Sequence, residues 1–130
     1  MLRNGIPGHH DLAWEPLLKA HKVDMFVAAH MHSYERFLPV FNGSSSPRFL
    51  DDTTVIKGAD SPVHIVTGAA GNVEDQEGFD SPPAYSAVRS SSYGYNRMTI
   101  HNDTHLEWTF VVTDNSTDQG LQEDLMWLVK

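Results

Sequence analysis

The strongest constraint on the fold is the alternation of apolar and polar residues in the last third of the chain. In "YNRMTIHNDTHLEWTFVV" (residues 95–112), apolar residues recur at every second position on both sides of a polar turn at Asn102 and Asp103. A period of two is typical of a β-strand with one buried face, and a short turn joins two such strands. We therefore predict a β-hairpin with a last strand, "DLMWLVK" (residues 124–130), paired back onto it. The apolar positions of the hairpin are Met98, Ile100, Leu106, Trp108, Phe110 and Val112, and we expect the Trp and Phe in the core.

The first third of the chain predicts a helix followed by a strand. Residues 11–22, "DLAWEPLLKAHK", carry apolar residues at three- and four-residue spacings. Pro16 places the start of this helix near Glu15, because proline is tolerated in a first turn. Residues 23–29, "VDMFVAA", form a nearly continuous apolar run that predicts a buried strand leading into His30. A helix followed by a buried strand indicates an α/β fold.

The middle of the chain alternates between polar and apolar segments. Residues 42–61 and 73–92 are polar and are predicted to be loops. Between them "PVHIVTG" (residues 62–68) predicts a second short buried strand, which ends in a glycine-rich turn at residues 68–72. We see no internal repeat and no linker, so residues 1–130 are predicted to belong to a single domain.

Composition excludes several classes of function. The chain has 130 residues, of which 40% are hydrophobic and 20% charged, which is typical of one globular domain. The net charge of −8 and the lack of a Lys or Arg run argue against nucleic acid or an anionic membrane surface as a partner. No apolar run approaches the roughly 20 residues that cross a bilayer. Cysteine is absent, which excludes disulfides and thiolate metal sites.

Patterns for N-glycosylation point to the secretory pathway. Three of the six Asn residues, Asn42, Asn102 and Asn115, begin an N-x-[ST] sequence, where the Ser and Thr content predicts about one by chance. In contrast, the first residues, "MLRNGIPGHHDL", lack the apolar core of a secretory signal. A chain that has lost its N-terminal part would account for both observations.

Two histidines one residue apart are the first candidates for chemistry. His30 and His32 lie in "AAHMHSYERF", just after the first predicted strand. In an extended backbone residues i and i+2 point to the same side, so the two rings would serve neighbouring cations about 3.5–4 Å apart, as in two-metal hydrolytic sites. The alternative is chance, because eight histidines in 130 residues produce such a pair fairly often. Spacing alone leaves both interpretations open.

The residues after this pair identify a family. "AHMHSYERFLPVFNG" resembles the G-H-x-H-x-Y-E-R block of purple acid phosphatases, within the calcineurin-like metallophosphoesterase superfamily. Ala29 stands where the block has Gly, as in animal-like members. Four more segments resemble the C-terminal portion of the family, in the expected order: "WEPLLKAHKVD", "SPVHIVTGAAGNVE", "AYSAVRSSSYGYNRMTIHNDTHLEW" and "EDLMWLVK". The resemblance implies the C-terminal part of an α-β-β-α sandwich.

The same resemblance implies a dinuclear metal centre that hydrolyses phosphate monoesters at acidic pH. The centre pairs Fe(III) with Fe(II), Zn(II) or Mn(II), and by likeness His30 would bind the divalent ion and His32 the ferric ion. Family members take their other ligands from D-x-G, G-D-x-x-Y and G-N-H-[DE] blocks that precede this region, and this sequence contains no G-D pair and no G-N-H. We therefore expect a partial domain without the N-terminal metal-binding half, and a chain that is inactive or nearly so by itself.

Residues around the histidine block have candidate supporting roles. Tyr34, Glu35 and Arg36 are predicted to support the metal ligands, with a Glu-Arg pair that anchors the loop and orients the rings. The glycine-rich turn at residues 68–72 lacks the Lys-Ser/Thr of a P-loop. We expect it to be a tight turn that borders the active site.

The sequence also contains weaker candidates for site residues and is compatible with two other functions. His9 and His10 are possible remnants of a substrate-side histidine loop. One alternative function is a non-catalytic interaction module derived from the same fold. Another is a mononuclear zinc-binding protein, in which a carboxylate such as Asp24 or Glu35 completes the site of the histidine pair.

Overall fold

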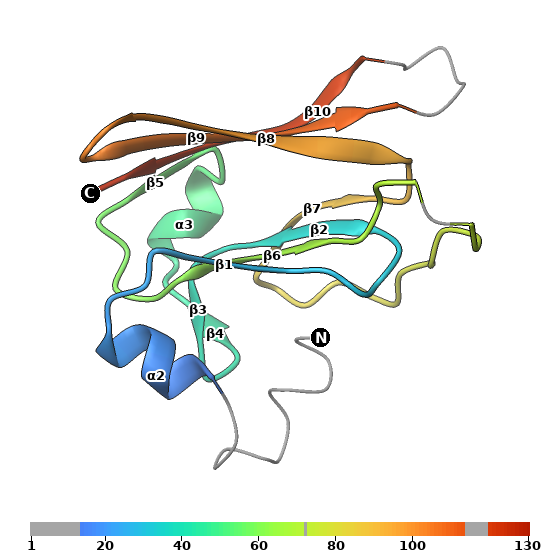
Figure 1. Ribbon diagram of the computed structural model, residues 1–130. Helices are drawn as coiled ribbons and strands as arrows, with labels where there is room; N and C mark the ends of the chain where they lie inside the picture. The colour runs from blue at the N-terminus through green and yellow to red at the C-terminus, as the bar shows by residue number, and fades with distance from the viewer. Residues whose placement is uncertain (1–13, 72, 114–119) are drawn as a thin grey trace.

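The computed structural model describes residues 14–71, 73–113 and 120–130 (Figure 1). Most of the described elements are strands, and they form two four-stranded sheets and a small hairpin. The elements are α2 (Glu15–Ala20), β1 (Met25–Ala28), β2 (Tyr34–Phe37), β3 (Val40–Phe41), β4 (Ser44–Ser45), α3 (Arg48–Asp51), β5 (Val55–Lys57), β6 (Val63–Thr67), β7 (Ser86–Ser90), β8 (Gly94–Asn102), β9 (His105–Val112) and β10 (Gln122–Val129).

The first sheet contains both strands predicted from apolar runs. Its order is β1-β6-β2-β7, with β1 parallel to β6 and β2 antiparallel to both of its neighbours. β6 is buried along most of its length, as predicted. β1 forms where predicted but is not buried, because it is an edge strand in this structure and Val27 is 43% exposed. Since β1 and β6 are parallel, their carboxyl ends lie at the same edge of the sheet.

The second sheet confirms the predicted hairpin and last strand. Its order is β5-β10-β9-β8, with β9 antiparallel to both β8 and β10. Trp108 and Phe110 are buried in the core, as predicted. Met98 and Ile100 pair with Trp108 and Leu106 and so share their face of the sheet. They are nevertheless 50% and 68% exposed, so the inner face of β8 is incompletely covered.

Both predicted loops contain regular structure. The segment 42–61 includes β4, α3 and β5, and the segment 73–92 includes β7. β5 pairs parallel with β10, and β7 pairs antiparallel with β2. These strands are short and have no apolar alternation of their own; in β5 only Ile56 is buried. They form because a distant strand offers a free edge, which local sequence patterns do not reveal.

The two sheets pack face to face with the hydrophobic core between them (Figure 1). The rings of Tyr34 and Phe110, one from each sheet, stack with centroids 4.2 Å apart. α2 and the β3–β4 hairpin lie on the outer side of the first sheet (Figure 1). α2 begins at Glu15 with Pro16 in its first turn, which confirms the predicted start. The layers match the predicted α/β class with antiparallel strands at the C-terminal end.

Candidate functional site

The histidine pair lies at the edge of the first sheet where two parallel strands end. His30 comes two residues after the end of β1, and His32 lies in the bend that leads into β2. Gly68 follows directly after β6, the parallel neighbour of β1. The carboxyl edge of parallel strands is the common location of binding sites in α/β proteins. The fold therefore places the candidate ligands where a site is expected.

The backbone at the pair is not extended, which corrects the geometry assumed from the sequence. His30 has a φ of +86°, and residues 31–33 form a bend. Residues 29–33 have to reverse the chain between β1 and β2, and His is one of the residues that tolerate positive φ. The alternating geometry of a strand therefore does not describe this pair. His30 is exposed, and the side chain of His32 is 25% exposed.

The glycine-rich turn borders residues 29–33, the loop that carries His30 and His32 and that we call the histidine loop. A Cβ atom on Gly68 would overlap the carbonyl group of Met31, so only glycine permits this approach. The Gly68 amide donates to the Ser33 carbonyl at 3.1 Å, and the Ser33 amide donates to the Met31 carbonyl at 2.8 Å. These contacts fix the main chain on both sides of His32.

Two glutamates hold His32 from the other side, and the sequence analysis missed both. The Glu77 amide donates to the His32 carbonyl at 3.0 Å, and the His32 amide donates to Oε2 of Glu77 at 3.2 Å. Oε2 of Glu74 lies 3.5 Å from Nδ1 of the His32 ring. Both residues come from an irregular segment, so periodicity gave no signal. The acidic composition of "VEDQE" was the only available indication.

A buried polar cluster joins the two sheets just beyond the loop. Oδ2 of Asp124 accepts from the Tyr34 hydroxyl at 2.5 Å and from Nε of Arg36 at 2.7 Å, and its Oδ1 accepts from Nη2 of Arg36 at 2.8 Å. Nη1 of Arg36 donates to the Thr53 carbonyl, and Nε1 of Trp108 donates to the Tyr34 hydroxyl. Burial, together with the Asp124 carboxylate, raises the pKa of Tyr34 well above its ordinary value. We call Tyr34, Arg36, Trp108 and Asp124 the sheet-bridging cluster.

Glu35 and Arg36 do not form the predicted pair. Adjacent residues of a strand point to opposite faces, so Arg36 faces the second sheet and Glu35 the outer side. Oε1 of Glu35 accepts from Nε of Arg89 at 2.6 Å and from the Ser86 hydroxyl at 2.7 Å. Both of these partners lie on β7, so this pair links two strands of one sheet. Asp124, by contrast, is a partner that the sequence analysis did not single out.

The other predicted site residues do not gather around the histidines. Asp24 pairs with Lys130 at 2.7 Å, and Glu35 pairs with Arg89, so in this structure both carboxylates contact cationic side chains and not the histidines. In the three described ranges, no group of three or more His, Cys, Asp or Glu residues is arranged to hold a metal ion. His9 and His10 lie outside the described residues, as does the third glycosylation candidate, Asn115.

The histidine pair suits part of a metal centre. Imidazole is a good ligand for iron and zinc, and both rings have solvent access at the sheet edge. The main chain around His32 is held by hydrogen bonds, as a ligand requires for a fixed orientation. The residues therefore fit two ligands of a larger centre and not a complete one.

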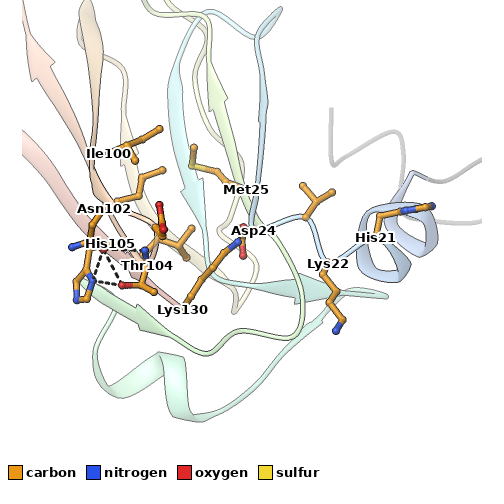
Figure 2. Close-up of a pocket in the computed structure, with 13 residues that line it drawn as sticks. His21, Lys22, Asp24, Met25, Ile100, Asn102, Thr104, His105 and Lys130 are labelled. Atoms are coloured by element: carbon orange, nitrogen blue, oxygen red, sulfur yellow. Dashed lines mark hydrogen bonds and ion pairs between the residues drawn. The ribbon is translucent and has the colours of Figure 1, made fainter.

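A hollow in the described part of the chain is remote from these histidines. A pocket of about 520 Å³ lies between the start of β1 and the turn of the β8–β9 hairpin (Figure 2). Figure 2 shows the Asp24–Lys130 pair at its centre and Asn102, Thr104 and His105 grouped at one side. Its lining includes the beginning of β1, whereas His30 follows the end of that strand. The pocket is thus separate from the candidate site.

Comparisons with known proteins concern the family of the chain. A family model described as "Iron/zinc purple acid phosphatase-like protein C" matches residues 61–119. "Acid phosphatase type 7" of Danio rerio is 40% identical over 122 residues, which cover 89% of this chain and 25% of that protein. "Purple acid phosphatase 18" of Arabidopsis thaliana is 35% identical over 116 residues, which cover 88% and 23%. The chain is similar to the C-terminal portion of purple acid phosphatases.

The structure of a purple acid phosphatase from yellow lupin seeds agrees with the fold. It matches with a TM-score of 0.73 at 19% identity, over 89% of this chain and 19% of the lupin chain. At this identity the likeness concerns the fold alone. The chain spans about a quarter of the length of the curated relatives it matches. The resemblance to purple acid phosphatases that the histidine block indicated is thereby confirmed.

Proposed function

We propose that this chain is part of an enzyme that hydrolyses phosphate monoesters at a dinuclear metal centre of Fe(III) with Fe(II), Zn(II) or Mn(II). In this proposal His30 binds the divalent ion and His32 the ferric ion. The observation that carries the proposal is the position of the histidine block at the shared carboxyl edge of β1 and β6, beside Gly68. The names of the relatives, acid phosphatase and purple acid phosphatase, support the reaction class.

The chain contributes ligands and their support. When bound, two adjacent cations polarise a phosphoryl group and make hydroxide from water at low pH. The exposed ring of His30 and the partly exposed ring of His32 supply neutral nitrogen donors. Glu77 holds the His32 main chain, and Glu74 lies beside its ring, where a carboxylate favours one ring orientation. Gly68 lets the glycine-rich turn approach the loop closely.

The remaining ligands come, in this proposal, from a part of the enzyme outside these 130 residues. Two imidazoles do not hold a dinuclear centre by themselves, because Fe(III) needs hard oxygen donors and a bridging carboxylate. The chain accounts for about a quarter of the relatives' length, which leaves room for those donors elsewhere. We accordingly expect the isolated chain to have little or no phosphatase activity.

For the cellular compartment, we propose secretion or a lysosomal location. Asn42 lies in an exposed turn and Asn102 at the exposed end of β8, so both sites are open to N-glycosylation, and Asn115 is a third candidate in the sequence. No helix of the described ranges is long and apolar enough to cross a membrane. Mass spectrometry of the secreted protein before and after removal of N-glycans tests this, and unmodified Asn42 and Asn102 would contradict it.

Metal content and turnover together test the enzymatic proposal. The 130-residue chain and the product of the coding sequence that includes its upstream region are purified and analysed for iron, zinc and manganese, and for hydrolysis of a phosphate monoester. We expect two metal ions and turnover only in the longer product, with both lost in His32→Ala. Rapid turnover by the short chain would contradict the proposed division of ligands. One zinc ion per short chain without turnover would favour the mononuclear zinc protein instead.

A further inference from the structure

We propose that Asp124, on the last strand β10, is a positioning residue for the metal ligand His32 and acts through Tyr34. The proposal rests on the proposed function, since it concerns the same ligand. It adds a residue from the second sheet, 92 positions further along the chain than the histidine it positions. No sequence motif connects the two.

The connection from Tyr34 to the histidine loop is short. Tyr34 is the first residue of β2 and comes two residues after His32. Ser33 between them is buried, and hydrogen bonds to Met31 and Gly68 hold its main chain. No freely rotating segment separates Tyr34 from the histidine. Any displacement of Tyr34 therefore moves the main chain that carries the imidazole.

The second sheet fixes Tyr34 at both its ring and its hydroxyl. The ring is fully buried and lies parallel to Phe110, with 5° between the ring planes. The hydroxyl donates to Asp124 at 2.5 Å and accepts from Nε1 of Trp108 at 3.1 Å. Both sides of the hydroxyl are thus used, and its position is determined by the cluster.

Asp124 is itself held rigidly. Arg36 binds its two carboxylate oxygens through Nε and Nη2, the bidentate arrangement that gives strong and directional hydrogen bonds. Both side chains are at most 2% exposed, so water does not replace these contacts. A tyrosine hydroxyl directed at such an acceptor has one favourable position. The Asp124 carboxylate therefore fixes the position of Tyr34, the first residue of β2.

A separate test distinguishes positioning from plain stability. Tyr34→Phe removes only the hydroxyl and keeps the ring on Phe110, and the Arg36–Asp124 pair remains intact. A role limited to stability would lower the unfolding free energy without altering the bound metal or the His32 ring. A positioning role changes the binding of the metal and the His32 ring in protein that is still folded.

The experiment uses the longer product that includes the upstream region, freed of metal, with Zn²⁺ alone as the probe. Zn²⁺ affinity is measured by calorimetric titration, and the His32 ring is followed through its imidazole ¹H–¹⁵N signals. For Tyr34→Phe we expect affinity to fall about tenfold, as for other outer partners of metal ligands, with a shifted or broadened His32 signal. Tyr95→Phe is the matched control, because Tyr95 is exposed and its hydroxyl contacts only Arg97 among the described residues. It should leave both measurements unchanged.

The outcomes separate this proposal from the one on which it rests. Zn²⁺ binding that is lost in His32→Ala and weakened in Tyr34→Phe, but not in Tyr95→Phe, supports the positioning role. Binding that Tyr34→Phe leaves intact, with an unchanged His32 signal, overturns the positioning role alone. Failure of the unaltered longer product to bind Zn²⁺ through His32 overturns both. Asp124→Asn is expected to act in the same direction, and Tyr34→Phe keeps the test valid if that variant does not fold.

Discussion

The histidine loop and the sheet-bridging cluster are neighbours in sequence but opposites in environment. His30 is exposed, has a positive φ and is not held by any described side chain, whereas Tyr34 and Arg36 are fully buried and hydrogen-bonded. The loop keeps its ring nitrogens available, and the cluster uses nearly all of its donors and acceptors internally. Within the seven residues 30–36, the exposed His30 and the partly exposed His32 are the candidate metal ligands, and the buried Tyr34 and Arg36 stabilise the fold. Substitutions in the two regions should therefore have very different effects on folding.

The largest effect is expected for Asp124→Ala. This change leaves the Arg36 guanidinium buried without a counter-charge, which costs about 3–5 kcal/mol in other proteins. The unfolding free energy is measured by urea denaturation monitored by tryptophan fluorescence. The control is the double variant Arg36→Met with Asp124→Leu, which removes both charges and should recover most of the loss. A single variant as stable as the original chain would show that the cluster does not anchor the sheets.

Gly68→Ala tests the close contact that supports the loop. The added Cβ would overlap the Met31 carbonyl, and forced overlap of this kind costs about 1–3 kcal/mol. Gly78→Ala is a matched control, since a Cβ there meets no atom within 4 Å. Denaturation of both variants gives the comparison. Equal stabilities would mean that the turn moves away from the loop without cost.

Alkaline pH should weaken the cluster but not the loop. The pKa of Tyr34 is raised in the folded state above its ordinary value of 10.0, so above that pH the unfolded chain loses this proton and the folded chain keeps it. The folded state then binds more protons, and the unfolding free energy falls as pH rises, by up to about 1.4 kcal/mol per pH unit for one such group. Urea denaturation between pH 9 and pH 11, roughly one unit on either side of that value, measures this slope. Tyr34→Phe should have a shallower decline than the original chain; identical slopes would assign the decline to other groups.

The smallest effect on stability is expected for His32→Ala. The ring of His32 is partly exposed, and its only described side-chain contact is the 3.5 Å approach to Glu74. The main-chain bonds to Glu77 remain, so we expect the unfolding free energy to change by less than about 0.5 kcal/mol. Denaturation without added metal measures this value. A loss as large as that of Asp124→Ala would remove the contrast between the two regions.

Elements with a strong internal pattern were predictable. The hairpin of β8 and β9, the pairing of β10 and the start of α2 at Glu15 followed from alternation, turn chemistry and the position of a proline. β5 and β7 were not predictable, because their few residues acquire a strand conformation only from β10 and β2. The sequence also did not indicate that β1 is an exposed edge strand. An apolar run predicts a strand but not the number of strands that pair with it.

The features of the candidate site also fall into those that the sequence predicted and those that it did not. The histidine block, and through it the family, was recognisable because neighbouring residues of a loop stay together in any fold. The positive φ of His30, the glutamates at His32 and the partner of Arg36 were not recognisable. Each of these depends on a contact between segments that are distant along the chain.

The amino-acid sequence alone determined which side chains are available for metal binding, where the hairpin turns and which family the chain resembles. These are local properties, set by side-chain chemistry and by the periodicity of a single segment. Only the tertiary structure decided that Arg36 meets Asp124 and Glu35 meets Arg89 on opposite faces of β2. The register between strands and the packing of one sheet on the other select these partners, and both follow from the summed burial of many side chains rather than from any one segment.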